Sequence, residues 1–211
     1  KVLLDGAEMS LRYGEKVCLM GKNGAGKSTF IKAVLDPNSD FICQGEIKIG
    51  SRVSIGYIPQ EIKFENESAT VLDVARKAFD GTETHLRASL AKFLFYGENV
   101  FKRVGSLSGG EKVRLKLFEL IQKKANLLIL DEPTNHIDID TKEMLEEALK
   151  EYEGTLFFIS HDRYFINQLA ERIENIEDQH FVNYLGNYDY YKEQKSRTLS
   201  LNNDTNLKGR K

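Results

Sequence analysis

Short apolar runs alternate along the chain with segments in which apolar residues recur every three or four positions. The runs are typical of buried strands, and the recurring segments are typical of one face of a helix. Five runs predict strands, at 16–20, 46–49, 53–58, 126–131 and 154–160. Strands that alternate with helices favour a parallel sheet with helices on its faces, so the pattern predicts an α/β fold.

Amphipathic helices are predicted at four places. The first covers 28–35, the second ends at Gly97 and the third follows Gly110. The fourth begins near Asp140, where Asp140 and Glu143 resemble a capping box. The apolar stripes of the second and third helices are Leu86, Leu90, Phe93 and Leu94, and Val113, Leu117, Leu120 and Ile121.

The last part of the chain has a different pattern. Residues 173–184 alternate as in a β-hairpin, and a tyrosine-rich segment, 184–191, follows them. Beyond it the chain is polar, mostly basic and without periodicity, as in a frayed end, although a basic arm that touches RNA phosphates is the alternative. We expect one domain over 1–191, with a helical subdomain at about 66–122, and a polar basic tail or linker stub at 192–211.

Composition excludes several classes of protein. The 211 residues are 41% hydrophobic and 29% charged, which is ordinary for a globular protein and rules out disorder of the whole chain. No apolar run approaches the 20 or so residues of a membrane span, and no secretory signal opens the sequence. Cys18 and Cys43 are too few for a disulfide framework, so a cytoplasmic location is expected. The net charge of −2 argues against a whole-domain field that attracts nucleic acid.

A glycine-rich motif lies between a predicted strand and a predicted helix. Its glycines let successive backbone N–H groups converge on phosphate oxygens at the positive end of the helix. The spacing is that of a phosphate loop, in which Lys27 would reach the β- and γ-phosphates and the Ser28 hydroxyl would bind Mg²⁺. A chance glycine-rich turn is disfavoured by the flanking strand and helix. The residues that we assign to the bound nucleotide are Gly21, Lys22, Asn23, Gly24, Ala25, Gly26, Lys27, Ser28 and Thr29.

Two adjacent carboxylates end the buried strand 126–131. Neighbouring side chains at a strand end point in different directions, so Asp131 can hold Mg²⁺ while Glu132 faces the attacking water as a general base. Solvated turn residues are the alternative. The phosphate loop elsewhere in the chain disfavours that alternative, and the pair therefore predicts a nucleoside triphosphate and Mg²⁺ as ligands.

A second anion-binding end is predicted where Ser108 and two glycines begin a helix. One nucleotide that already fills the phosphate loop cannot also use this end within a compact domain. A second copy of the fold is therefore implied, in which this end caps the γ-phosphate bound by its partner. A plain helix N-cap by Ser108 is the alternative. The residues that we assign to action across such an interface are Ser108, Gly109, Gly110 and Glu111.

With these motifs, the chain resembles the nucleotide-binding domain of the ATP-binding cassette (ABC) superfamily. The resemblance implies a P-loop NTPase domain with a mainly parallel sheet, a small antiparallel part and a helical signature subdomain. It also implies roles for three further residues. Gln60 matches the residue that contacts Mg²⁺ and the attacking water, His161 the switch histidine that senses the γ-phosphate, and Asp138 the intersubunit aspartate. Without the family, Gln60 would be a surface residue and His161 a structural hydrogen-bonding group.

A narrower resemblance is to the ABC-F branch, whose members have two cassettes in one chain and act on ribosomes. Residues 131–138 are close to the extended motif of that branch, and 107–117 and 186–191 resemble its carboxy-terminal cassette. The short separation of Gln60 and Ser108 leaves no room for the helical arm of the amino-terminal cassette. The adenine-stacking aromatic of the family would lie a few residues before Lys1, so we expect the sequence to begin inside the domain.

We therefore expect an ATP-hydrolysing cassette that dimerises head to tail around two ATP–Mg²⁺. The second cassette would be the amino-terminal half of a longer chain, or a second copy of this one. The ribosome, with its rRNA and tRNA, would be met through parts outside this sequence, in translation or in antibiotic resistance. The alternative is the ATPase subunit of an ABC transporter. A chromosome-maintenance ATPase is disfavoured because no long coiled coil interrupts the motifs, and a module without turnover is disfavoured by Glu132.

Overall fold

The computed structural model describes residues 2–42 and 44–208, with side chains up to Thr198, so Cys43 lies outside the described residues. The strands are β1 (Lys16–Gly21), β2 (Ile55–Ile58), β3 (Leu127–Asp131), β4 (Thr155–Ile159), β5 (Arg172–Glu177) and β6 (His180–Tyr184). The α-helices are α1 (Lys27–Leu35), α2 (Val71–Ala78), α3 (Glu83–Lys92), α4 (Gly109–Gln122), α5 (Ile139–Glu151), α6 (Arg163–Leu169) and α7 (Tyr188–Lys208). Two 3₁₀ helices, η1 (Gly97–Phe101) and η2 (Val104–Ser106), precede α4.

One sheet of six strands organises the chain, in the order β2-β3-β4-β1-β5-β6. Neighbouring strands from β2 to β5 are parallel, and β6 returns antiparallel to β5 as the predicted hairpin. Parallel strands end at the same edge of a sheet, where ligands of α/β folds bind. The sheet thus brings the ends of β1, β3 and β4 together, although 110 positions separate Gly21 and Asp131 in sequence.

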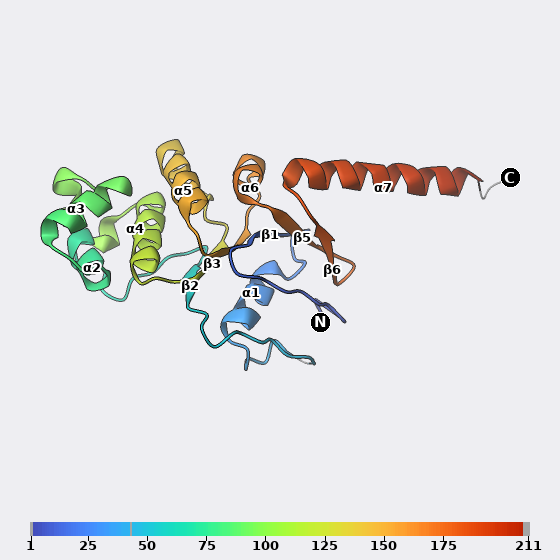
Figure 1. Cartoon of the computed structure of the whole chain (residues 1–211), viewed down its shortest axis with the longest axis horizontal. Coiled ribbons are helices and arrows are strands. Elements are labelled where there is room, and N and C mark those ends of the chain that lie inside the picture. Colours follow the sequence, from blue (N-terminus) through green and yellow to red (C-terminus); the bar gives the residue numbers. More distant parts are fainter. Residues whose placement is uncertain (1, 43, 209–211) are drawn as a thin grey trace.

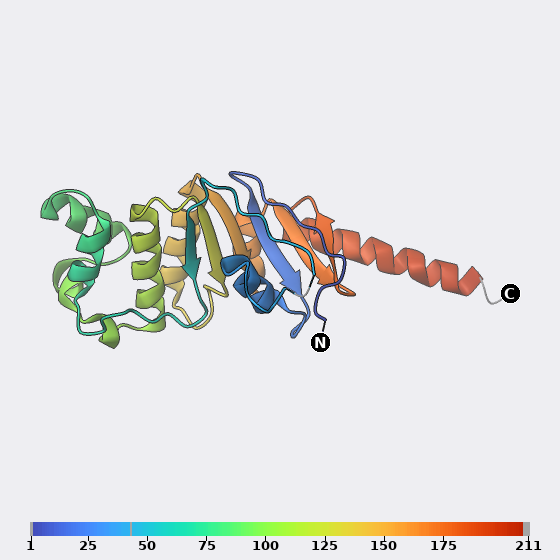
Figure 2. The ribbon, with the colours of Figure 1, turned by 90° about the horizontal axis from the view of Figure 1, so that it is seen from below.

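Helices cover both faces of the sheet. In Figure 1, α1 lies on one face, and α5 and α6 lie on the other. Side chains alternate between these faces along each strand, so Ile129 and Phe157 pack on the α1 side while Leu128 and Leu130 pack on the α5 side. Figure 2 shows the strands side by side, with α4 beyond the edge strand β2. The predicted α/β architecture is confirmed.

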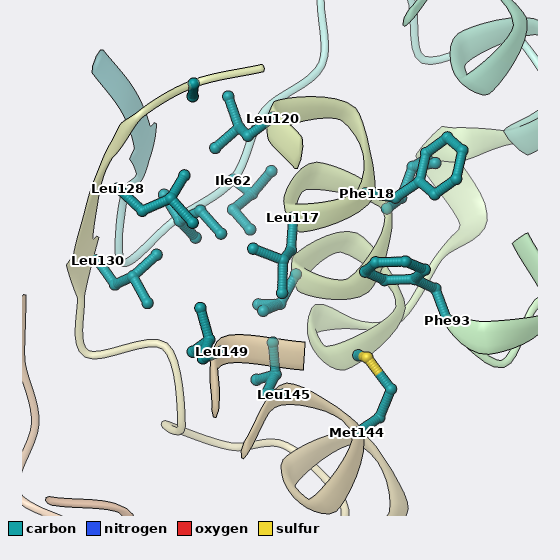
Figure 3. Packing of buried hydrophobic residues seen from close by; sticks show 14 of the residues in the cluster. Ile62, Phe93, Leu117, Phe118, Leu120, Leu128, Leu130, Met144, Leu145 and Leu149 are labelled. Atoms are coloured by element: carbon teal, nitrogen blue, oxygen red, sulfur yellow. The ribbon is translucent and has the colours of Figure 1, made fainter. Parts of the chain in front are cut away.

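Helix α4 joins the sheet to the helices at one end of the molecule. Figure 3 shows Leu117 pointing from α4 toward Leu128 and Leu130 of β3. On another side of α4, the rings of Phe93 and Phe118 meet edge to face, with centroids 5.3 Å apart. The helical end is therefore continuous with the core of the sheet rather than a separate unit.

Several element boundaries differ from the expectations. Residues 46–49 form no strand, because in the described part of the chain their backbone groups have no partner strand, and β2 begins only at Ile55. Helix α3 ends at Lys92 rather than at Gly97, because Leu94 turns into the left-handed region (φ 61°) and this turn buries Phe95. Helix α5 is capped by Asp138, not by Asp140.

Helices α6 and α7 were not anticipated from the sequence, and α2 was covered only by the helical subdomain expected at about 66–122. Thr70 and Asp73 form a capping box at the start of α2, a signal that the sequence contained. The tail expected at 192–211 is helical as far as Lys208, so its backbone is regular rather than frayed. Figure 1 shows α7 projecting away from the sheet toward the C-terminus. No helix in the described part of the chain is both long and apolar enough to cross a membrane.

Candidate functional site

The phosphate loop connects β1 to α1, as its sequence context predicted. Gly24 (φ 77°) and Gly26 (φ 101°) adopt left-handed conformations that side chains with a Cβ rarely take, and Gly26 is the N-cap of α1. No side chain caps this helix, so its first N–H groups remain directed at the loop. Lys22 and Asn23 are exposed on the loop, Ala25 is half-buried, and Thr29 lies in the first turn of α1.

Lys27 folds back into the phosphate loop. Its buried ammonium donates hydrogen bonds to the carbonyl oxygens of Gly21, at 2.9 Å, and Lys22, at 3.3 Å. Because both acceptors are neutral backbone carbonyls, they accept hydrogen bonds from the Lys27 ammonium without neutralising its charge. The lysine is therefore held at the place where phosphate oxygens would meet it.

Ser28 and Asp131 lie side by side at the carboxyl edge of the sheet. The Ser28 hydroxyl, in the first turn of α1, donates to Oδ1 of Asp131 at the end of β3, at 3.4 Å. Asp131 is buried, and this burial raises the pKa of its carboxyl, although the Ser28 hydrogen bond and the charge of Lys27 act in the opposite direction. Hydroxyl and carboxylate oxygens are the donors that Mg²⁺ prefers, so this pair fits the metal assigned to it.

Glu132 adopts an unusual backbone conformation directly after β3. Its φ is 54°, and its N–H donates to the carbonyl oxygen of Ile159, which ties the turn to β4. Its Oε1 lies 3.0 Å from Nε2 of His161, while Oε2 is buried without a hydrogen-bond partner in the described structure. Burial raises the pKa of Glu132, and the nearby His161 acts against that rise. One carboxylate oxygen is thus oriented by His161, and the other is a buried acceptor to which no group donates in the described structure.

His161 is positioned by residues that the sequence analysis did not single out. The Ser160 hydroxyl lies 3.2 Å from that of Thr134 and accepts the N–H of Asp162. Asp162 caps α6 through the N–H of Phe165 and forms an ion pair with Lys142 of α5. An acidic residue directly before a helix was the available signal, but its partner on α5 could not be inferred from spacing.

Gln60 lies at the same edge as the carboxylates. Ile58 pairs in register with Leu130, so Gln60 follows β2 where Glu132 follows β3, and its side chain is exposed. The structure thus places Gln60 one strand away from Asp131. Gln60 forms no hydrogen bond with either carboxylate in the described structure.

The signature residues lie apart from the phosphate loop of the same chain. Ser108 is the N-cap of α4, and it forms a capping box with Glu111, whose other carboxylate oxygen accepts from Lys102 at 2.8 Å. A Cβ on Gly110 would lie 3.2 Å from Asp138, so α4 begins close against the start of α5. Ser108, Gly109, Gly110 and Glu111 lie at the start of α4, beyond the edge strand β2, whereas the phosphate loop follows β1 on the far side of β3 and β4 (Figure 2).

The motif residues thus form two groups at different places in the fold. The loop, Asp131, Glu132 and His161 form one cluster at the carboxyl edge of the sheet, and Ser108 belongs to a second, separate end of the molecule. Ser108 does cap α4, as in the alternative interpretation of this residue. That capping role leaves its exposed side chain and the exposed Gly109 facing solvent.

Comparisons with known proteins place this geometry in a family. Residues 4–135 match the sequence profile of the family described as ABC transporter. The chain is 50% identical to YdiF of Bacillus subtilis over 94% of its length, and 38% identical to ABC transporter F family member 5 of Arabidopsis thaliana over 98%. It is also 38% identical, over 94% of its length, to the energy-dependent translational throttle protein EttA of Escherichia coli K12.

The chain spans about a third of the length of these relatives, covering 31%, 30% and 37% of them respectively. A solved structure, an ATP-binding cassette bound to ADP and Pi in a dimeric post-hydrolysis state, matches with a TM-score of 0.63 and 21% identity. That match covers 86% of this chain and 89% of the other. It supports the fold.

Proposed function

The chain belongs to the ABC transporter family and is an ATPase domain of it, and from this we propose that it binds and hydrolyses ATP–Mg²⁺ as one half of a head-to-tail pair of cassettes. The observation on which the pairing depends is that Ser108 begins α4 beyond the edge strand β2, whereas the phosphate loop follows β1, with β3 and β4 between the two strands (Figure 2). Each composite site would combine the loop of one cassette with the signature of the other.

Binding of the triphosphate follows from the geometry of the loop. The uncapped N–H groups of α1 and the ammonium of Lys27 are directed at one place, and both favour anions. Lys27 would exchange its bonds to two backbone carbonyls for stronger bonds to phosphate oxygens. Ser28 and Asp131 would hold Mg²⁺, which neutralises charge on the β- and γ-phosphates when bound.

Hydrolysis would depend on Glu132. Its Oε2, which has no hydrogen-bond partner in the described structure, can accept a proton from the attacking water. The raised pKa of Glu132 also lies closer to the pKa that suits a general base near neutral pH. His161 holds the other oxygen, Oε1, and would sense the γ-phosphate from the end of β4. Gln60, at the end of β2, would complete the site when the nucleotide binds.

We place this domain in an ABC-F protein, as its carboxy-terminal cassette. The similarity to an F family member and to a protein named a translational throttle supports this assignment. The partner cassette would be the other half of the full-length chain, the location cytoplasmic, and the target the ribosome. Opening and closing of the pair with ATP hydrolysis would be the motion that the ribosome responds to.

The test of the paired site mixes two variants of the chain, which here acts as its own partner. Ser108→Arg places a bulky cation where the γ-phosphate of the partner would lie, and Lys27→Ala removes the phosphate contact. In a mixed dimer, one composite site has an intact loop and an intact signature, while the other has both lesions. We expect ATPase activity in the mixture that neither variant shows alone.

Ser108→Ala is the matched control, because it also loses the helix cap, at a cost of about 1 kcal/mol, but leaves the space of the phosphate open. It should retain more activity than Ser108→Arg. If the mixture stays at the sum of the two variants while nucleotide binding and dimerisation persist, Ser108 does not act across the interface.

A further inference from the structure

A cavity of about 580 Å³ lies beside the phosphate loop, on the side of β5. One wall is the loop itself, and another is the turn after β5. Val2 and Leu3 also border the cavity, and the remaining wall is formed by Tyr191 and Lys195 of α7, the helix that the catalytic assignment does not use. The start of the last helix of the chain thus borders a loop that lies near its beginning.

Glu177, the last residue of β5, holds α7 at this cavity. Its Oε2 lies 2.7 Å from Nζ of Lys195, and both side chains are about two-thirds buried. Its Oε1 accepts from Asn175 Nδ2 at 2.5 Å and from the Tyr184 hydroxyl at 3.0 Å. The Tyr184 ring in turn meets that of Tyr191 edge to face, with centroids 5.0 Å apart. Sheet and helix are therefore joined by one polar and one aromatic contact.

Strand order determines which part of a nucleotide would reach this cavity. The residues that would act at the γ-phosphate lie on one side of β1. Asp131 ends β3, Glu132 follows it, and His161 follows β4. The cavity lies on the other side of β1, next to β5. A nucleoside triphosphate whose phosphates occupy the loop would therefore extend its ribose and base toward β5 and α7. The volume lies within the roughly 300–1,000 Å³ of ordinary small-molecule pockets.

We propose that Tyr191 and Lys195 of α7 form the wall that contacts the nucleoside end of ATP, so that nucleotide binding and the docking of α7 on the sheet stabilise each other. This rests on the proposed binding of ATP at the phosphate loop. Ribose hydroxyls can donate to Glu177, and the lysine and the tyrosine ring can contact a base. Because α7 projects from the molecule, a change in its docking when the nucleotide binds would be transmitted along the helix, away from the sheet (Figure 1).

The test compares ATP with inorganic tripolyphosphate, which lacks a nucleoside, by calorimetric titration of the 211-residue chain. The variant is the double substitution Glu177→Gln/Lys195→Met, which removes both members of the ion pair and leaves the local net charge unchanged. We expect the ratio of the ATP dissociation constant to the tripolyphosphate dissociation constant to rise by about tenfold, as for the loss of one hydrogen bond to a charged group.

The matched control is Arg197→Met, on the same helix. Arg197 pairs with Glu193 on an exposed surface, so the ratio should stay within about twofold of the parent. An unchanged ratio in the double variant would overturn the inference. Failure of the parent chain to bind either ligand would instead refute ATP binding itself.

Hydrogen exchange provides a second readout that does not need a variant. ATP should slow exchange in the first two turns of α7, from Tyr188 to Lys195, more than tripolyphosphate does. Equal exchange with the two ligands would show that α7 responds only to occupation of the phosphate loop, and it would overturn the nucleoside contact.

Discussion

At the scale of single residues, Glu132 combines three unfavourable features. Its backbone is left-handed, one carboxylate oxygen is buried without a partner, and burial raises its pKa. Such features persist only where the surroundings enforce them, and here the bonds from the backbone to Ile159 and Asn135 do so. A side chain held this way is suited to chemistry rather than to stability.

Glu132→Gln should therefore separate binding from turnover. The amide keeps the shape of the carboxylate but cannot accept the proton of water, so we expect ATP binding near that of the parent and turnover lower by roughly 10²-fold or more. Closed ATP-bound dimers should accumulate, which light scattering would detect. Equal steady-state rates at saturating ATP would remove Glu132 from the role of base.

Asp138 provides a prediction with a defined dependence on pH. It accepts the N–H of Thr141 at 2.8 Å and its hydroxyl at 2.9 Å, and the bond from the N–H holds the pKa of Asp138 below its usual range. A lowered pKa stabilises the fold above the unfolded-state value of about 4, and this contribution is lost as pH falls through the folded-state value.

Asp138→Ala should thus cost about 1 kcal/mol at pH 7, and the difference from the parent should shrink below about pH 4. Urea unfolding at several pH values would measure it. Asp140→Ala is the control, because Asp140 does not cap α5, and it should cost no more than about 0.5 kcal/mol. Equal costs for the two variants would contradict the observed cap.

At the scale of elements, α4 links the signature end to the strand that positions the carboxylates. Its apolar face packs on β3 and α5 (Figure 3), and the closeness of Gly110 to Asp138 brings its N-terminus near that of α5. Movement of α4 would therefore displace the neighbours of Asp131.

Leu117→Ala tests this packing. Leu117 is fully buried, so the lost contacts and the remaining cavity should lower the free energy of unfolding by about 2–5 kcal/mol. Leu185→Ala removes the same atoms from a side chain that is 75% exposed, and it should change stability by less than about 0.5 kcal/mol. Denaturant melts of both variants compare them directly, and similar costs would mean that α4 is not part of the core.

At the scale of the whole molecule, the phosphate loop and Ser108 lie in different parts of the fold. The phosphate loop and Glu132 share the carboxyl edge of the sheet, whereas Ser108 lies at the start of α4, beyond β2. Each composite site that we propose therefore needs two cassettes.

The chain alone should therefore be a monomer and a poor ATPase. Light scattering should give the mass of one chain without ATP, and ATPase activity per chain should rise with protein concentration because pairing limits it. Fast turnover that does not depend on concentration would contradict the two-cassette site.

The sequence by itself determined the parts of the protein that depend on local rules. The phosphate loop from Gly21 to Ser28, the buried strand before Asp131 and the start of a helix at Ser108 were all predicted, because glycine spacing, apolar runs and capping residues act within a few positions. The parallel sheet followed from the alternation of such segments.

Only the tertiary structure decided what depends on distant partners. The strand expected at 46–49 has no neighbouring strand to pair with among the described residues, and helix α3 ends early so that Phe95 can enter the core. The left-handed turn at Glu132 and the contact of Lys195 with Glu177 likewise depend on residues far away in sequence. Backbone hydrogen bonding and burial are satisfied across the whole fold, so no local pattern can specify them.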